Sequence, residues 1–203
     1  MIAAYANPGV IVSAVSPGNG VGGIIGWNES GAVLQLSGSS AAVSGPGINS
    51  DVGGCAGING GSVVTCFNLG AITGSVLSAG GVVGYQQSTG TILNSYNNGN
   101  VSGGTTNQGG VVGQNAGTIT SSHNYGSVGA TASCTGRFAG DNTGGTILSG
   151  HFNTSSSGPA GAVGCGPNTG GGLTAAQMAL QANFAGWDFA ATWVIGAQYP
   201  ILQ

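Results

Sequence analysis

Charged side chains are almost missing from this chain. Its 203 residues include one arginine, no lysine and four acidic residues, whereas about a quarter of the residues are charged in an ordinary soluble domain. A single basic residue excludes an electrostatic platform for nucleic acid, because such platforms neutralise several phosphates. The lack of lysine excludes lysine-linked crosslinks between subunits. The charged residues are Glu29, Asp51, Arg137, Asp141 and Asp188.

Long apolar runs and metal-binding spacings are also missing. No stretch of about 18 apolar residues occurs, so no membrane-spanning helix is expected. The four cysteines contain no Cys-x-x-Cys pair of the kind that holds zinc, and we expect neither a metal nor a cofactor. An even number of cysteines in this composition favours disulfides. We predict the pairs Cys55–Cys66 and Cys134–Cys165, with buried free thiols as the alternative.

Glycine is abundant and recurs with a fixed period. A cluster of the form Gly-Gly-x-x-Gly returns five times, the last time in a degenerate form, and successive clusters start 31, 27, 29 and 27 residues apart. This period is typical of a solenoid, in which each turn buries its apolar side chains against the turns above and below. The clusters begin at Gly22, Gly53, Gly80, Gly109 and Gly136.

Each cluster is followed by a corner with an amide side chain and then by a short strand. Stacked amides can hydrogen-bond from turn to turn. Strand side chains alternate between two faces, so one column is predicted to point inward and its neighbours outward. The amide column is Asn28, Asn59, Gln86, Asn115 and Asn142, the inward column is Val33, Val63, Ile92, Ile119 and Ile147, and a partly aliphatic outward column is Leu34, Val64, Leu93, Thr120 and Leu148.

The clearest copy reads Gly80-Gly81-Val82-Val83-Gly84, then Gly90-Thr91-Ile92-Leu93-Asn94-Ser95-Tyr96, then Gly99-Asn100-Val101. These residues resemble the GLUG repeat, a glycine-rich module of bacterial cell-surface proteins, and the resemblance extends over roughly residues 21–153. It implies an extracellular, adhesive or structural role and supplies no catalytic residues.

We therefore predict an all-β chain, a right-handed parallel β-solenoid of about five turns of 27–31 residues with three short strands per turn. The solenoid spans residues 21–165 and a C-terminal cap spans residues 166–203. In the cap, Thr174 and Gln177 fit a helix capping box. Its aromatic residues favour a plug over the last turn, and a binding site built on Trp187 and Trp193 is the alternative.

Residues 1–20 contain the strand-forming triplet Val10-Ile11-Val12. Two interpretations are open for this segment. It lies on its own first turn, or it acts as a donor strand that adds to the edge of another molecule. The scarcity of charge favours the second interpretation, which predicts end-to-end self-association into a homopolymer.

The sequence contains few residues suited to catalysis. His123 and His151 occupy the column that holds aromatic residues in earlier repeats, which favours an aromatic ladder over a metal site. Arg137 and Asp141 flank one glycine cluster and are expected to pair, without a nucleophile or second acid nearby.

The chain is predicted to be a secreted structural or adhesive protein at the bacterial cell surface, and not an enzyme. The favoured form is a self-assembling subunit of an extracellular filament or surface layer. Its contact residues would be the aliphatic outward column, which is typical of an interface, and the Val10–Val12 triplet. The alternative is an ice-binding or polysaccharide-binding solenoid that acts through a flat face of Ser and Thr.

Overall fold

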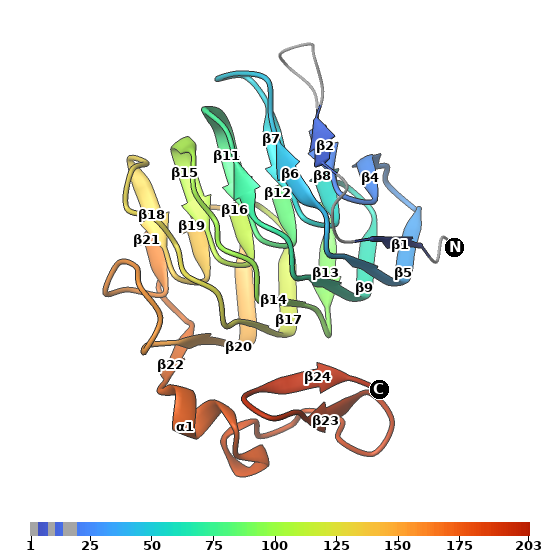
Figure 1. The fold of residues 1–203 in the computed structure, drawn as a ribbon, viewed down its shortest axis with the longest axis vertical. Helices are drawn as coiled ribbons and strands as arrows, with labels where there is room; N and C mark the ends of the chain where they lie inside the picture. The colour runs from blue at the N-terminus through green and yellow to red at the C-terminus, as the bar shows by residue number, and fades with distance from the viewer. Residues whose placement is uncertain (1–3, 8–10, 14–19) are drawn as a thin grey trace.

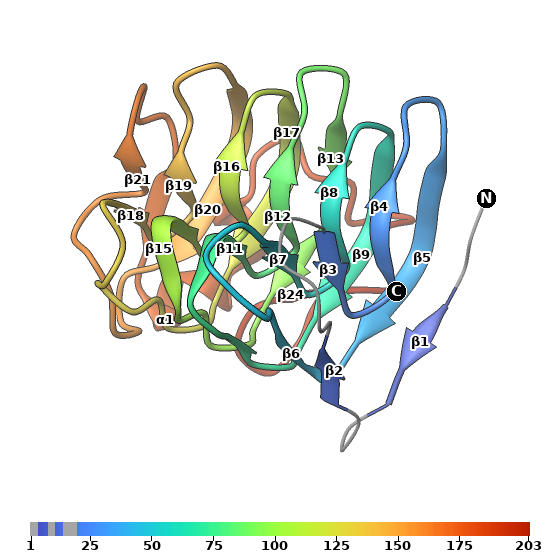
Figure 2. The ribbon, with the colours of Figure 1, turned by 90° about the horizontal axis from the view of Figure 1, so that it is seen from above.

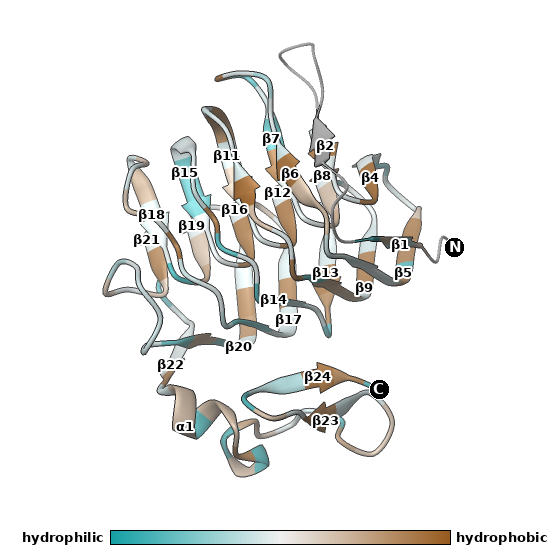
Figure 3. Cartoon of the chain, viewed as in Figure 1, coloured by the Kyte–Doolittle hydropathy of each residue, from teal (hydrophilic) through white to brown (hydrophobic). Residues whose placement is uncertain are grey.

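The computed structural model describes residues 4–7, 11–13 and 20–203, and it confirms a nearly all-β solenoid of about five turns. Successive coils stack side by side and pair through parallel strands (Figures 1 and 2). Hydrophobic stretches lie within the strands, whereas the connecting loops are mostly pale or hydrophilic (Figure 3).

Sheet A contains the strands that follow the amide corners. In spatial order they are β1 (Tyr5–Ala6), β5 (Val33–Ser39), β9 (Ser62–Asn68), β13 (Thr91–Leu93), β17 (Thr118–Asn124), β20 (Thr146–Asn153) and β22 (Gly171–Leu173), and β14 (Tyr96–Asn97) continues the coil of β13 between β9 and β17.

The strands of sheet C come directly before the glycine clusters in the sequence, and the strands of sheet D come directly after them. Sheet C contains β3 (Gly20–Gly22), β7 (Asp51–Gly53), β11 (Val76–Gly80), β15 (Gly104–Gly109) and β18 (Cys134–Gly136), and sheet D contains β4 (Ile25–Asn28), β8 (Ala56–Asn59), β12 (Val83–Gln86), β16 (Val112–Asn115), β19 (Ala139–Asp141) and β21 (Val163–Cys165). In each coil a strand of sheet C leads into the glycine cluster and a strand of sheet D follows it. The sequence predicts a single strand at the cluster, so a coil has more than the three predicted strands.

The glycines allow sheets C and D to approach each other closely. A Cβ added at Gly84 in sheet D would lie 2.5 Å from the backbone nitrogen of Val52 in sheet C, which no side chain tolerates. The close approach divides the interior of the solenoid into two apolar clusters, one between sheets A and D and one between sheets B and C.

Sheet B is short and includes the N-terminal segment. Its strands are β2 (Ile11–Ser13), β6 (Ala42–Ser44) and β10 (Ile72–Thr73), and isolated bridges continue it to Val101 and Val128. Strand β2 pairs with β6, and β1 pairs with β5 of the same chain. The described part of the N-terminal segment therefore lies on its own first turn, and it is not held free as the predicted donor strand. Val10 lies outside the described residues.

The inward column of sheet A is confirmed from the second coil onward. Val63, Ile92 and Ile119 pair in register and are buried. In the first coil the prediction is wrong by one residue, because Leu34 pairs with Val63 and is 0% exposed. One more residue lies between Gly31, which has a left-handed φ of 82°, and the buried Leu34 than between Gly61 and Val63 in the next coil, and a one-residue slip exchanges the two faces of a strand.

Amide side chains connect neighbouring coils, as the sequence predicts. Asn28 Nδ2 donates to Asn59 Oδ1 at 2.8 Å, and Asn59 Nδ2 donates to Gln86 Oε1 at 2.9 Å. A second such ladder runs through the corner after sheet A, from Asn68 to Asn97 and on to Asn124. These bonds satisfy polar groups that the stacking of the coils buries.

In each of the five coils, the chain that runs through sheet A contains one non-glycine residue with positive φ. The five residues have φ between 45° and 53° and lie in one column: Leu36, Thr65, Asn94, Ser121 and Ser149. Left-handed backbone at non-glycine residues is uncommon. The kink shifts the alternation of faces, so that Cys66 lies in the core while Phe67 contacts the cap outside the coil.

The C-terminal cap contains α1 (Ala175–Met178), a 3₁₀ turn η1 (Gln181–Asn183) and an antiparallel hairpin of β23 (Trp193–Ile195) and β24 (Pro200–Leu202). The predicted capping box of Thr174 and Gln177 is present. The plug over the last turn is a wrong prediction, because the cap lies along the flank of the stack beneath sheet A (Figure 1). At this flank Trp187 and Trp193 of the cap pack with Tyr96 of the solenoid in one apolar cluster.

Candidate functional site

The contact between the cap and the solenoid is built on an aromatic ladder. The rings of Phe67 and Tyr96 stack with centroids 5.6 Å apart, and Tyr96 stacks on His123 at 5.1 Å. Trp187 and Trp193 of the cap pack against this ladder and are buried. The two tryptophans therefore fill the interior of the contact instead of forming the binding site that the sequence left open.

Both histidines lie in this contact, as the ladder interpretation predicts. His123 Nε2 lies 2.8 Å from the carbonyl oxygen of Pro200, and His151 meets Phe184 edge to face at 5.0 Å. Burial lowers the pKa of His123 to about 3 and also lowers the pKa of His151. Across residues 4–7, 11–13 and 20–203, no group of three or more His, Cys, Asp or Glu side chains could hold a metal ion.

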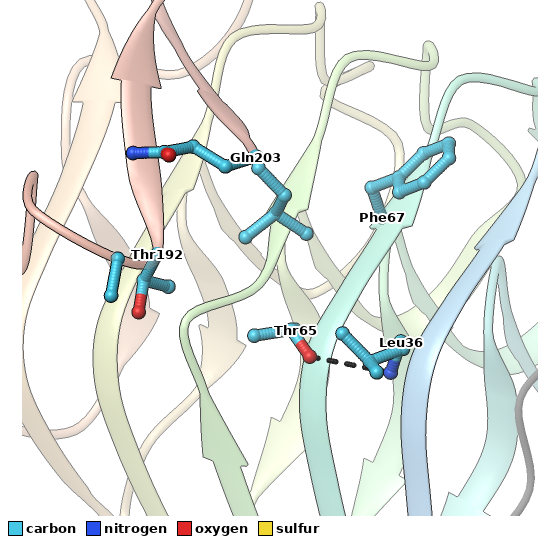
Figure 4. A pocket seen from close by; sticks show the side chains of 7 residues that line it. Leu36, Thr65, Phe67, Thr192 and Gln203 are labelled. Atoms are coloured by element: carbon cyan, nitrogen blue, oxygen red, sulfur yellow. Dashed lines mark hydrogen bonds between the residues drawn. The ribbon is translucent and has the colours of Figure 1, made fainter.

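A pocket of about 320 Å³ opens at the N-terminal end of the ladder (Figure 4). Leu36, Thr65 and Phe67 form its wall on the solenoid side, and the cap supplies the other wall with Ala191, Thr192, Leu202 and Gln203. Leu36 N donates to Thr65 Oγ1 at 3.2 Å across the solenoid wall. The lining is uncharged, so the pocket suits a small uncharged group with an apolar face. This pocket could not be predicted from the sequence, because its two walls are far apart along the chain.

The aliphatic outward column keeps its predicted orientation in the later coils. Leu93 is 37% exposed and Leu148 is 51% exposed, and Val64 and Thr120 lie between core and solvent in the same column. Leu34 does not belong to this column, since it is buried in the core. The exposed strip of sheet A therefore starts at the second coil.

One of the two predicted disulfides is present. Cys134 in β18 and Cys165 in β21 are bonded, with Cα atoms 5.3 Å apart. The predicted Cys55–Cys66 disulfide is wrong, because both thiols are free and buried. Cys55 Sγ donates to the carbonyl of Phe67 at 3.3 Å, and the contact with Cys66 together with burial raises the pKa of Cys55. A protonated thiol does not undergo disulfide exchange.

We expect that replacing both Cys134 and Cys165 by serine lowers the unfolding free energy by about 2–4 kcal/mol, because the bond closes a loop between residues 31 apart. Chemical denaturation checks the loss. Alkylation of the unfolded, unreduced parent should label Cys55 and Cys66 alone. Labelling of all four cysteines, or of none, would contradict the assignment.

Arg137 does not pair with Asp141, in contrast to the sequence prediction. Its guanidinium is buried and donates to carbonyl oxygens of the loop from Asn153 to Pro159. The Asp141 carboxylate accepts from Thr143 N at 2.8 Å and from Thr143 Oγ1 at 2.6 Å. Asp141 is the last residue of β19 in sheet D. Arg137 precedes β19, and its side chain extends towards the loop from Asn153 to Pro159.

Comparisons with known proteins add one structural relative. No family model and no curated protein matches this chain. The fold is similar to the crystal structure of a putative immunoglobulin A1 protease from Bacteroides ovatus, with a TM-score of 0.65 and 18% sequence identity over 98% of this chain and 74% of that chain. At this identity the likeness shows a shared fold.

The neighbour corrects one prediction from the sequence. The sequence predicts that this solenoid is not an enzyme, and a chain of similar fold that is described as a putative protease contradicts that prediction. The prediction rested on the lack of a recognisable catalytic pattern in the sequence, which carries little weight when the fold brings distant residues together.

Among the residues that the structure describes, none of the helices has the length and apolar character that a membrane span requires.

Proposed function

We propose that this chain is an extracellular structural or adhesive domain of a bacterial surface protein, and that it associates with copies of itself through the exposed strip of sheet A. The observation that carries the proposal is the alignment of Leu93 and Leu148, two exposed leucines, in one column along a nearly uncharged stack. Regular exposed apolar strips are typical of interfaces. The Cys134–Cys165 disulfide supports a location outside the cytoplasm. The resemblance to the GLUG repeat, which is itself a prediction, also implies an extracellular role.

Self-association can be measured by sedimentation velocity over a range of concentrations and by electron microscopy. We expect concentration-dependent assemblies that change little between low and high salt, because few charges take part. Replacing both Leu93 and Leu148 by serine should shift the equilibrium to the monomer. The matched control, Thr91→Ser with Thr146→Ser, changes the adjacent exposed column and should assemble as the parent does. A parent that stays monomeric at every concentration overturns the proposal.

The structural neighbour supports a second candidate, a domain that acts on or binds an immunoglobulin. The neighbour is described as a putative immunoglobulin A1 protease, and the structural match covers 98% of this chain. Incubating the protein with immunoglobulin A1 and separating the products by electrophoresis tests cleavage, and surface plasmon resonance tests binding. A lack of both cleavage and binding removes this candidate without affecting the first.

A further inference from the structure

The cap depends on the aromatic ladder for its own core. Met178, Phe184, Trp187 and Trp193 of the cap share one apolar cluster with Tyr96 of the solenoid. The cap has one four-residue helix and one short hairpin, and elements of this size are not stable in water without a packed partner. Losing the contact with the ladder therefore means losing the structure of the cap.

His123 is the central solenoid residue of this contact. It is 0% exposed, and Tyr96 and Trp187 stack on it with centroids 5.1 Å and 6.0 Å away. A carbonyl oxygen only accepts hydrogen bonds, so the bond to Pro200 requires the proton on Nε2. Nδ1 is buried and has no hydrogen-bond partner. A second proton on this ring would thus be a buried charge with no acceptor beside it.

His151 repeats the arrangement one coil further on. Its ring lies 5.0 Å from Phe184 and 5.7 Å from Trp187, and its Nδ1 atom is buried, although the side chain as a whole is only partly buried. Burial lowers the pKa of His151, and the nearby backbone of Gly171 opposes part of that shift. The two histidines pair in register on β17 and β20. If both were protonated, two like charges would meet inside one apolar contact.

Within residues 4–7, 11–13 and 20–203, no hydrogen bond joins either histidine to a carboxylate that could balance these charges. On the solenoid side, the titratable neighbours are Tyr96 and Tyr125, and the hairpin contributes Tyr199. Burial raises the pKa of Tyr96 and of Tyr199, so both stay neutral. Asp188 is the acidic residue of the cap, and its carboxylate accepts hydrogen bonds from its own loop, including Ala190 N at 3.0 Å.

We propose that the cap is an acid-released lid, which His123 and His151 hold on the solenoid while they are uncharged and which leaves the ladder when they are protonated. The lid covers the stacked rings of Phe67 and Tyr96, so its release exposes an aromatic surface along the flank of the stack.

The direction of the pH dependence follows from proton binding. Burial lowers the pKa of His123 to about 3 and lowers that of His151, whereas a histidine on a ladder that the cap has left returns to about 6.5. The released form therefore binds protons that the closed form does not, and the closed form loses stability as the pH falls from about 6.5 towards 3. Above this range the contact is fully stable.

The intrinsic fluorescence of the protein can report release separately from unfolding. Trp27 lies in β4, away from the cap, and a Trp27→Phe background leaves Trp187 and Trp193 as the reporters. Between pH 7 and pH 4 we expect a reversible red shift of their emission. Over the same range, hydrogen exchange at the backbone amides of Ile92 and Ile119 should stay slow. No emission change down to pH 4, or loss of protection at the same pH as the emission change, refutes the lid.

Variants assign the effect to the histidines. Phenylalanine occupies the same column at Phe67, so His123→Phe and His151→Phe fit the ladder, and the double variant should move the midpoint of release down by about one pH unit or more. His151→Phe alone, which keeps the bond to Pro200, should give a smaller shift. Glu29→Gln is the control and should leave the midpoint unchanged. An unchanged midpoint in both histidine variants overturns the proposal and points to Asp188.

Discussion

Replacing Arg137 by methionine is expected to lower the unfolding free energy by about 3–5 kcal/mol. The guanidinium donates to the carbonyl of Asn153 at 3.0 Å and to that of Gly158 at 3.2 Å, and further to Ser156 and Pro159. It thereby ties the loop after β20 to the last glycine cluster. Methionine fills a similar volume but leaves these carbonyls without a donor, and a charged hydrogen bond contributes more than a neutral one.

Differential scanning calorimetry measures this effect. For a chain of this size a loss of that magnitude corresponds to a decrease of about 10 °C in the melting temperature. Arg137→Lys keeps the charge but has fewer donors in a fixed plane, so it should fall between methionine and the parent. Asp141→Asn should melt close to the parent, because Asp141 bonds to Thr143 and not to Arg137. A methionine variant that melts with the parent would show that the loop is held by other contacts.

Replacing Ile92 by aspartate is expected to destabilise the protein by several kcal/mol, roughly 4 or more. Ile92 is 1% exposed and lies in register between Val63 and Ile119. A carboxylate at this position would be buried among aliphatic side chains with no donor nearby. It would either stay charged at a high cost in solvation or take up a proton.

The adjacent residue provides a matched comparison. Thr91 lies one position earlier on β13 and is exposed, so Thr91→Asp should cost less than about 1 kcal/mol. Its main loss is the hydrogen bond from Thr91 Oγ1 to Ser62 Oγ at 3.0 Å. Urea denaturation of both variants measures the difference. Similar losses in the two variants would contradict the assignment of the inward and outward faces.

The repeat in the sequence was enough to predict the stack and most of its inward column. A period near 28 residues fixes which residues lie above one another, and β-branched residues at the same place in each period mark the core. The first coil shows the limit of this reasoning. When Gly31 is taken as the counterpart of Gly61, one extra residue separates it from the strand, so Leu34 lies in the core and not on the predicted surface.

The kink in sheet A could not be predicted from the residue types. Leu36, Thr65 and Asn94 share a left-handed conformation, yet only asparagine among them favours it. Their conformation is set by the coils above and below. The loop contacts of Arg137 and the pocket at Phe67 were missed for a related reason, because each joins segments that local patterns do not connect.

The way the cap spans several coils also restricts how the chain can change in length. Asn98 Nδ2 bonds to Tyr199 Oη at 2.7 Å, and His123 Nε2 bonds to the neighbouring Pro200. These contacts join two adjacent residues of the cap to two successive coils, so duplicating or deleting a coil between Asn98 and His123 would break one of them. A coil added before β3 would leave every contact of the cap in place. We therefore expect a repeat to be gained more readily at the N-terminal side of the stack than beneath the cap, where these two contacts constrain the number of coils.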